Sequence, residues 1–204
     1  ELTYTMPAKL CAHTGMDALT HCMEAYVSTC ASMFTDANAL HGIREIVEWL
    51  PKSYAGDHEA RQHMHEAQCI AGIAFSSGLL GIVHSMAHPL GALYDTPHGV
   101  ANAIILPTVM EYNAPCTGEK YRDIAKAMGV EGTEKMSQEE YRKAAVDAVK
   151  QLSHDVGIPA NLKDIVKPED IPFLAQSAYD DACRPGNPRD TSVEEITELY
   201  KSLL

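Results

Sequence analysis

The sequence predicts an all-α domain, and three observations support that prediction. Aromatic residues are sparse, with one Trp and three Phe among 204 residues, so the core must be built from Ala, Leu, Ile, Val and Met. That composition favours packed helices. Apolar residues recur with the period of an amphipathic helix along most of the chain, and no segment shows the alternating pattern of a strand.

The first expected helices are bounded by capping residues and proline. One helix covers residues 14–30, with Thr14 as its N-cap, and a second ends at Leu50 because Pro51 follows. A long helix over 57–80 has an almost uncharged second half, which indicates burial on most sides.

Proline also delimits the helices that follow. A short helix carries His84 and His88 and ends at Pro89, and the Thr-Pro pair at 96–97 begins another that ends before Pro107. Beyond it the pattern predicts further helices near 107–113, 118–128, 137–156, 168–183 and 192–203. No repeat or low-complexity segment interrupts this order.

The length suits one large domain or two small ones, and we expect a single domain over residues 1–204. Charged residues are unevenly spread, with 14 in the 109 positions of residues 1–109 and 30 in the 95 positions of 110–204. We expect the apolar first part to bear the functional site and the second part to supply outer, solvated helices.

Charge and cysteine content limit the partners and the compartment. A net charge of −12 repels phosphate backbones and anionic lipids, so nucleic acid and membrane partners are not expected. No apolar run approaches the roughly 18 residues of a membrane span. Six cysteines without a Cys-x-x-Cys pair indicate reduced thiols of a cytoplasmic protein. The chain begins without Met, which suggests an excised domain, with a naturally truncated gene as the alternative.

Five residues form a candidate metal site. Two pairs are four residues apart, a spacing that places both side chains on one face of a helix, and a fifth residue follows. The five are Asp17, His21, His84, His88 and His98. Imidazole and carboxylate ligands suit Zn²⁺ or Fe²⁺. Spacing alone leaves a metal centre and ordinary core or surface histidines equally open.

Glu24 lies three residues after His21 on the same predicted helix. A carboxylate there can hydrogen-bond a ligating imidazole and orient it. The alternative is a solvated glutamate that stabilises the helix.

At these residues the sequence resembles the iron-containing (group III) alcohol dehydrogenases. The matching phrases, which follow one another along essentially the whole chain, are Thr14–Ser28, His84–Gly91, Pro97–Ala103 and Asn187-Pro-Arg189. The resemblance implies the multi-helix catalytic domain of the dehydroquinate synthase-like, iron-containing alcohol dehydrogenase architecture. The family's N-terminal α/β nucleotide-binding domain, with its Gly-Gly-Gly-Ser phosphate-binding turn, is missing from the chain.

The resemblance also implies roles for single residues. His88 matches a catalytic residue that lies near the nicotinamide without ligating the metal, and an imidazole is suited to relaying a proton. Phe75 and Cys183 match pocket-lining positions more loosely, with ordinary core packing as the alternative. The residues that match the four metal ligands are Asp17, His21, His84 and His98.

The implied activity is that of a metal-dependent, NAD(P)-linked alcohol dehydrogenase acting on a small alcohol or aldehyde. Fe(II) is the metal implied by the family, and Zn(II) or Ni(II) would suit the same ligands. The missing domain would bind most of NAD or NADP, so the chain alone should be inactive. Its expected partners are that nucleotide-binding domain and a second copy in a homodimer, since exposed apolar surface promotes association.

Two other functions stay open at this stage. One is an all-helical metal-dependent phosphohydrolase, for which the only His-Asp dipeptide is His154-Asp155. The other is a non-catalytic metal-binding helical domain. A ferritin-like di-iron protein is excluded because no Glu-x-x-His motif is present.

Overall fold

The computed structural model describes residues 1–204 and contains helices but no strands, as the sequence predicts. Short 3₁₀ turns connect several of the helices. The nine α-helices are α1 (Ala8–Val27), α2 (Met33–Tyr54), α3 (His58–Gly78), α4 (Ile82–Tyr94), α5 (His98–Asn113), α6 (Lys120–Ala127), α7 (Gln138–Asp155), α8 (Ile171–Tyr179) and α9 (Val193–Ser202).

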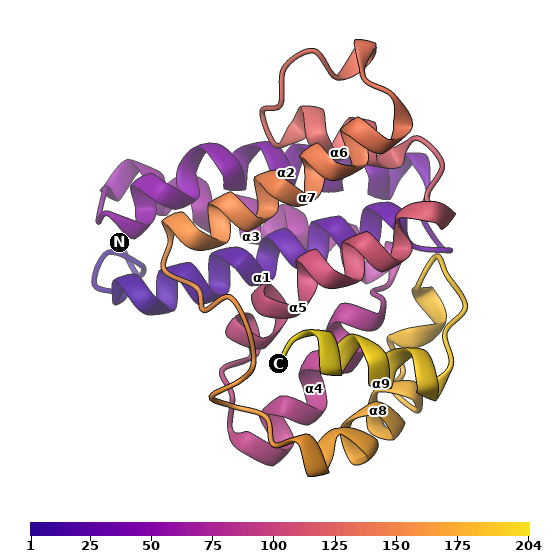
Figure 1. Ribbon diagram of the computed structural model, residues 1–204. Coiled ribbons are helices and arrows are strands. Elements are labelled where there is room, and N and C mark those ends of the chain that lie inside the picture. Colours follow the sequence, from indigo (N-terminus) through magenta and orange to yellow (C-terminus); the bar gives the residue numbers. More distant parts are fainter.

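Helices α1 and α5 pack against each other in the middle of the molecule (Figure 1). Helices α2 and α3 cover α1, and α7 contacts α5 and carries α6. On the opposite side α4 packs on α5, α8 packs on α4, and α9 packs on α8. Helices α1, α4 and α5, which carry the candidate site, are therefore braced from both sides.

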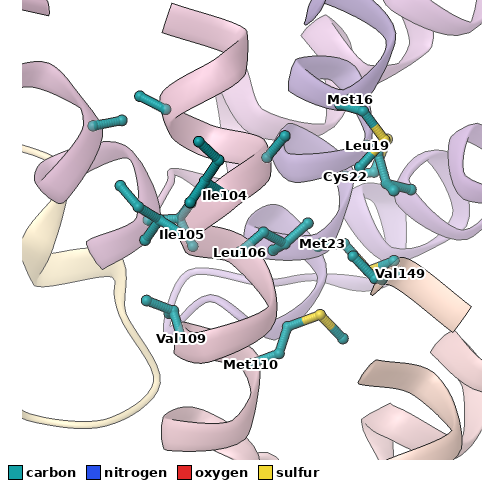
Figure 2. Close-up of a cluster of buried hydrophobic side chains, with 14 of the residues drawn as sticks. Met16, Leu19, Cys22, Met23, Ile104, Ile105, Leu106, Val109, Met110 and Val149 are labelled. Atoms are coloured by element: carbon teal, nitrogen blue, oxygen red, sulfur yellow. The ribbon is translucent and has the colours of Figure 1, made fainter. Parts of the chain in front are cut away.

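The core at the α1–α5 contact is aliphatic and sulfur-rich, as the composition predicts. Figure 2 shows α1 residues facing α5 residues, with Val149 of α7 alongside. The labelled side chains, all buried, are Met16, Leu19, Cys22, Met23, Ile104, Ile105, Leu106, Val109, Met110 and Val149. They belong to one hydrophobic core of 52 buried residues that extends over both halves of the chain.

Three prolines lie inside helices, where the sequence predicts helix ends. Helix α2 continues past Pro51, α4 past Pro89 and α5 past Pro107, so the two helices expected on either side of Pro107 are one. An internal proline removes one backbone hydrogen bond and crowds the preceding turn. Pro89 and Pro107 are buried in the core, and the packing of α4 and α5 outweighs that cost.

The first helix also starts earlier than the sequence predicts. Helix α1 begins at Ala8, and Thr14 is an interior residue whose Oγ1 donates to the carbonyl oxygen of Leu10 at 2.9 Å. Pro7 precedes the helix and makes no side-chain capping hydrogen bond. The true start therefore carries no capping signal, which is why Thr14 was the wrong N-cap.

A sharp corner joins α3 to α4. Leu79 at the corner has φ 64° and ψ −179°, a conformation that normally requires glycine and costs about 1–3 kcal/mol.

No single helix is long and apolar enough to cross a membrane. Helices α3 and α4 taken together satisfy the same length and composition test, as a pair bent by 108°.

Gly99 allows the first turn of α5 to approach α1. A Cβ on this glycine would overlap the backbone carbonyl oxygen of His13 in α1. Gly99 directly follows His98, so the close approach of the two backbones also fixes where that side chain begins.

Replacing Gly99 by Ala should destabilise the chain by about 1–3 kcal/mol, because the added methyl group forces α5 away from α1. Urea unfolding measures the change in the free energy of unfolding. Gly72→Ala is the matched control, since a Cβ at this helical glycine meets nothing within 4 Å. The control should stabilise the chain by up to about 1 kcal/mol. Equal effects of the two substitutions would contradict the role assigned to Gly99.

Candidate metal centre

Three helices supply the candidate residues. Helix α1 carries Asp17 and His21 one turn apart on one face, and Glu24 follows on the next turn. His84 lies in the first turn of α4, and His98 is the first residue of α5. Residues far apart in the sequence therefore meet where the ends of two helices reach the middle of a third.

Asp17 is at the centre of this group. Its Oδ1 lies 3.5 Å from Nε2 of His98 and 3.7 Å from Nε2 of His84. These three residues place one possible ligand atom each within 4.8 Å of one another. His21 lies beside them, with Nδ1 3.9 Å from Oδ2 of Asp17 and its ring stacked on that of His84 at 4.6 Å between centroids.

Glu24 orients His84. Its Oε2 lies 2.5 Å from Nδ1 of His84, and its Oε1 accepts a hydrogen bond from the backbone N–H of Val83 at 2.7 Å. The sequence suggests this carboxylate as a partner of His21, and that pairing is wrong. With Nδ1 of His84 occupied by Glu24, Nε2 is the ring atom left to face Asp17.

Nε2 of His84 is an unsatisfied polar atom within this cluster. It is buried and has no hydrogen-bond partner. A buried polar atom without a partner costs free energy, which a ligand or ion can recover. The missing partner points to a cation among the donors of this cluster.

Sequence reasoning missed Asn102, which lies one turn after His98. Its Nδ2 donates to Oδ1 of Asp17 at 2.6 Å and lies 3.0 Å from Nε2 of His98. The Nδ2 donor of Asn102 thus faces two atoms that would also coordinate a cation. The available signal was an asparagine within the apolar run Val100–Leu106, four residues after a candidate ligand.

The protonation states of His98, His21 and Asp17 suit a cation, whereas His84 would have to lose a proton. Burial lowers the pKa of His98 and lowers that of His21 to about 4, so both rings are neutral. Burial opposes ionisation of Asp17, but the neighbouring His84 and His21 outweigh it and lower its pKa. Burial also opposes protonation of His84, yet Glu24 and Asp17 raise its pKa to about 9. A metal ion would replace the proton on His84.

His88 lies at the edge of the cluster and points to a different carboxylate. Its ring is parallel to that of His98, at 5.5 Å between centroids, while its Nδ1 lies 2.8 Å from Oδ2 of Asp181. Cys183 lies beside this pair, and burial raises the pKa of its thiol to about 12. Asp181 was missed because Asp180-Asp181 looks like a solvated acidic pair in the sequence.

Phe75 of α3 stacks on the outer face of His21, at 4.4 Å between ring centroids. The aromatic ring shields one side of the candidate ligand from solvent. Phe75 and Cys183 thus both border the cluster, on its α1–α3 and α4–α8 sides respectively.

Comparison with known proteins identifies the family. Residues 11–204 match the model of the Fe-containing alcohol dehydrogenase family, C-terminal. The chain belongs to this family. The iron-containing dehydrogenase fold is shared by a crystal structure of 1,3-propanediol oxidoreductase, which is 44% identical with a TM-score of 0.96 over 98% of this chain and 53% of that one.

Two curated relatives are similar to the chain in sequence. Lactaldehyde reductase of Escherichia coli K12 is 57% identical over 96% of the chain and 51% of its own length. NADPH-dependent butanol dehydrogenase of Clostridium saccharobutylicum is 46% identical over 98% of the chain and 52% of its own length. The chain spans about half the length of the curated relatives that it matches.

Replacing Glu24 by Gln should lower the pKa of His84 below about 9, because the substitution removes a negative charge at Nδ1. The change should also weaken Zn²⁺ binding by about 10–100-fold. NMR titration of the His84 ring in the metal-free chain measures the first effect, and calorimetry the second.

Glu45→Gln is the control for this variant, because Glu45 pairs with His63 away from the cluster. It should leave both quantities unchanged. An unaltered pKa of His84 in Glu24→Gln would show that Asp17 alone sustains the charge on the ring.

Proposed function

We propose that this chain is the metal- and substrate-binding half of an NAD(P)-linked alcohol dehydrogenase that interconverts a small alcohol and its aldehyde. The observation that carries the proposal is the convergence of one carboxylate and several imidazoles from three helices around the unpartnered Nε2 of His84. Two relatives, a lactaldehyde reductase and a butanol dehydrogenase, are named for small alcohol or aldehyde substrates, which supports the same chemistry.

The residues present fit a divalent cation. Asp17 would supply the carboxylate, and His84, His98 and His21 the imidazole nitrogens, a donor set that leaves a net charge of about +1. We assign Fe²⁺ as the resident metal from the family, and Zn²⁺ or Ni²⁺ would bind the same donors.

When bound, such a cation supplies a Lewis acid that favours ionisation of an alcohol and polarises a carbonyl group. The chain's own residues would do the rest. Glu24 holds His84 in the orientation that a ligand needs, and Phe75 covers His21. His88, half exposed beside His98, is placed to carry a proton between substrate and solvent. Cys183 would line the pocket as an uncharged thiol.

A nucleotide-binding half would complete the site. The side chains of His88 and His98 are 41% and 43% exposed, and Leu79, one turn beyond Phe75, is also exposed. We propose that this surface faces the bound NAD or NADP and the domain that holds it. In the isolated chain the same surface favours pairing with a second copy, which sedimentation analysis would detect.

A phosphohydrolase is the weaker candidate. Nδ1 of His154 lies 3.4 Å from Oδ1 of Asp155, but these side chains are 84% and 47% exposed and lie outside the candidate metal site. Phosphatase activity without NAD(P) would nevertheless favour it over the dehydrogenase.

The metal assignment separates two histidines. In a fusion of this chain with a nucleotide-binding half, His98→Ala should lose the bound metal and the activity, because it removes a proposed ligand. His88→Ala should keep the metal while activity falls by about 10²–10⁴-fold, the usual worth of a proton-transfer group. Elemental analysis of the purified chain measures metal content, and His41→Ala, on the exposed side of α2, is the control. An empty His88→Ala variant would overturn this division of labour.

Hydride transfer needs both halves. A fusion that places this chain behind the N-terminal half of the E. coli lactaldehyde reductase should oxidise a small alcohol with NAD⁺ or NADP⁺. Chelation of the metal should abolish the activity, and added Fe²⁺ should restore it. The chain alone should bind one metal ion and show no turnover. Turnover that survives complete metal removal would overturn the proposed function.

A further inference from the structure

The contact between His88 and Asp181 has a defined geometry. Nδ1 of His88 lies 2.8 Å from Oδ2 of Asp181, a distance typical of a charge-assisted hydrogen bond. Asp181 carries a lowered pKa: its burial favours the neutral acid, but the backbone N–H of Cys183 and the His88 ring outweigh that effect. The carboxylate is therefore an acceptor, and the proton of the bond belongs to Nδ1 of His88.

Two donors hold the other carboxylate oxygen of Asp181, and one of them is a backbone N–H, which cannot become an acceptor. Oδ1 accepts a hydrogen bond from the backbone N–H of Cys183 at 2.8 Å and another from Oγ of Ser85 at 3.3 Å. A backbone N–H is a donor in every state of the protein. The carboxylate plane is thereby fixed on the loop after α8 and on α4 together.

The loop that carries Asp181 is itself anchored. The carbonyl oxygen of Gly186 accepts from the backbone N–H of Thr29 at 3.0 Å. The amides of Asn187 and Asn113 exchange two hydrogen bonds, at 2.8 and 2.9 Å, in the buried interior. A Cβ on Gly186 would overlap the backbone oxygen of Leu80, so the loop lies directly against the α3–α4 corner.

We propose that Asp181 is a positioning residue for the reaction: it keeps the proton of His88 on Nδ1 and leaves the Nε2 lone pair free as a proton acceptor. This inference rests on the proposed function. In the oxidation direction the alcohol O–H bond would break and its proton would pass to Nε2, while the hydride leaves carbon for NAD(P)⁺ and the carbonyl forms. The half-exposed ring then returns the proton to solvent.

Asp181→Asn tests the inference because it retains the size of the side chain. The fixed N–H of Cys183 requires the amide oxygen on its side, so the amide NH₂ group must face His88. Nδ1 of His88 then becomes an acceptor, and the proton moves to Nε2. The substitution therefore changes which ring nitrogen of His88 carries the proton, and it leaves both side chains in place.

Nitrogen-15 NMR of the His88 ring at about pH 8.5 measures directly which ring nitrogen carries the proton. The wild-type chain should show the Nδ1–H form and Asp181→Asn the Nε2–H form. Asp180→Asn is the matched control, because Asp180 is exposed and bonds Gln176. An unchanged tautomer in Asp181→Asn, or an Nε2–H wild type, would overturn the inference.

Metal loading and kinetics separate the two proposals. The wild-type, Asp181→Asn and Asp180→Asn chains should each bind one Zn²⁺. In the fusion with the nucleotide-binding half, kcat of Asp181→Asn should fall by about 10²–10⁴-fold with little change in KM. Asp181→Glu, which restores an anionic acceptor, should recover part of kcat. Full kcat in Asp181→Asn would overturn the positioning role while leaving the metal site intact. A wild-type chain without Zn²⁺ would instead overturn the proposed function.

Discussion

The buried carboxylate of Glu24 is the interaction on which the rest of the site depends. It is 5% exposed and reaches from α1 to two groups at the start of α4, the Val83 N–H and the His84 ring. A carboxylate is favoured there because the first N–H groups of a helix are unsatisfied and carry partial positive charge. One side chain thus docks α4 on α1 and aims Nε2 of His84 at Asp17.

The remaining helices make that arrangement rigid. Gly99 lets the start of α5 approach α1 closely enough for His98 to reach Asp17, and the anchored loop at Asp181 holds α4 through Ser85 and His88. Sites built on helices whose neighbours lock them in place hold donor atoms more precisely than sites on free loops. The exposed side of the cluster is the side from which substrate and nicotinamide would approach.

The helical period in the sequence was enough to predict the fold class. Core-facing aliphatic residues recur every three to four positions in any buried helix, independent of which helices pack against it. Helix ends were less predictable. Pro89 and Pro107 predict helix ends when only their neighbours in the sequence are considered. Burial against neighbouring helices makes the continuous α4 and α5 more stable than helices interrupted at these prolines. The start of α1 carries no cap to find.

The sequence by itself determined that Asp17, His21, His84 and His98 are candidate ligands, because i,i+4 spacing and family phrases are local properties. Only the tertiary structure decided which carboxylate serves which ring: Glu24 serves His84 rather than His21, and Asp181 serves His88. Hydrogen-bond partners form through space between helices, and sequence distance carries no information about which buried donor faces which acceptor.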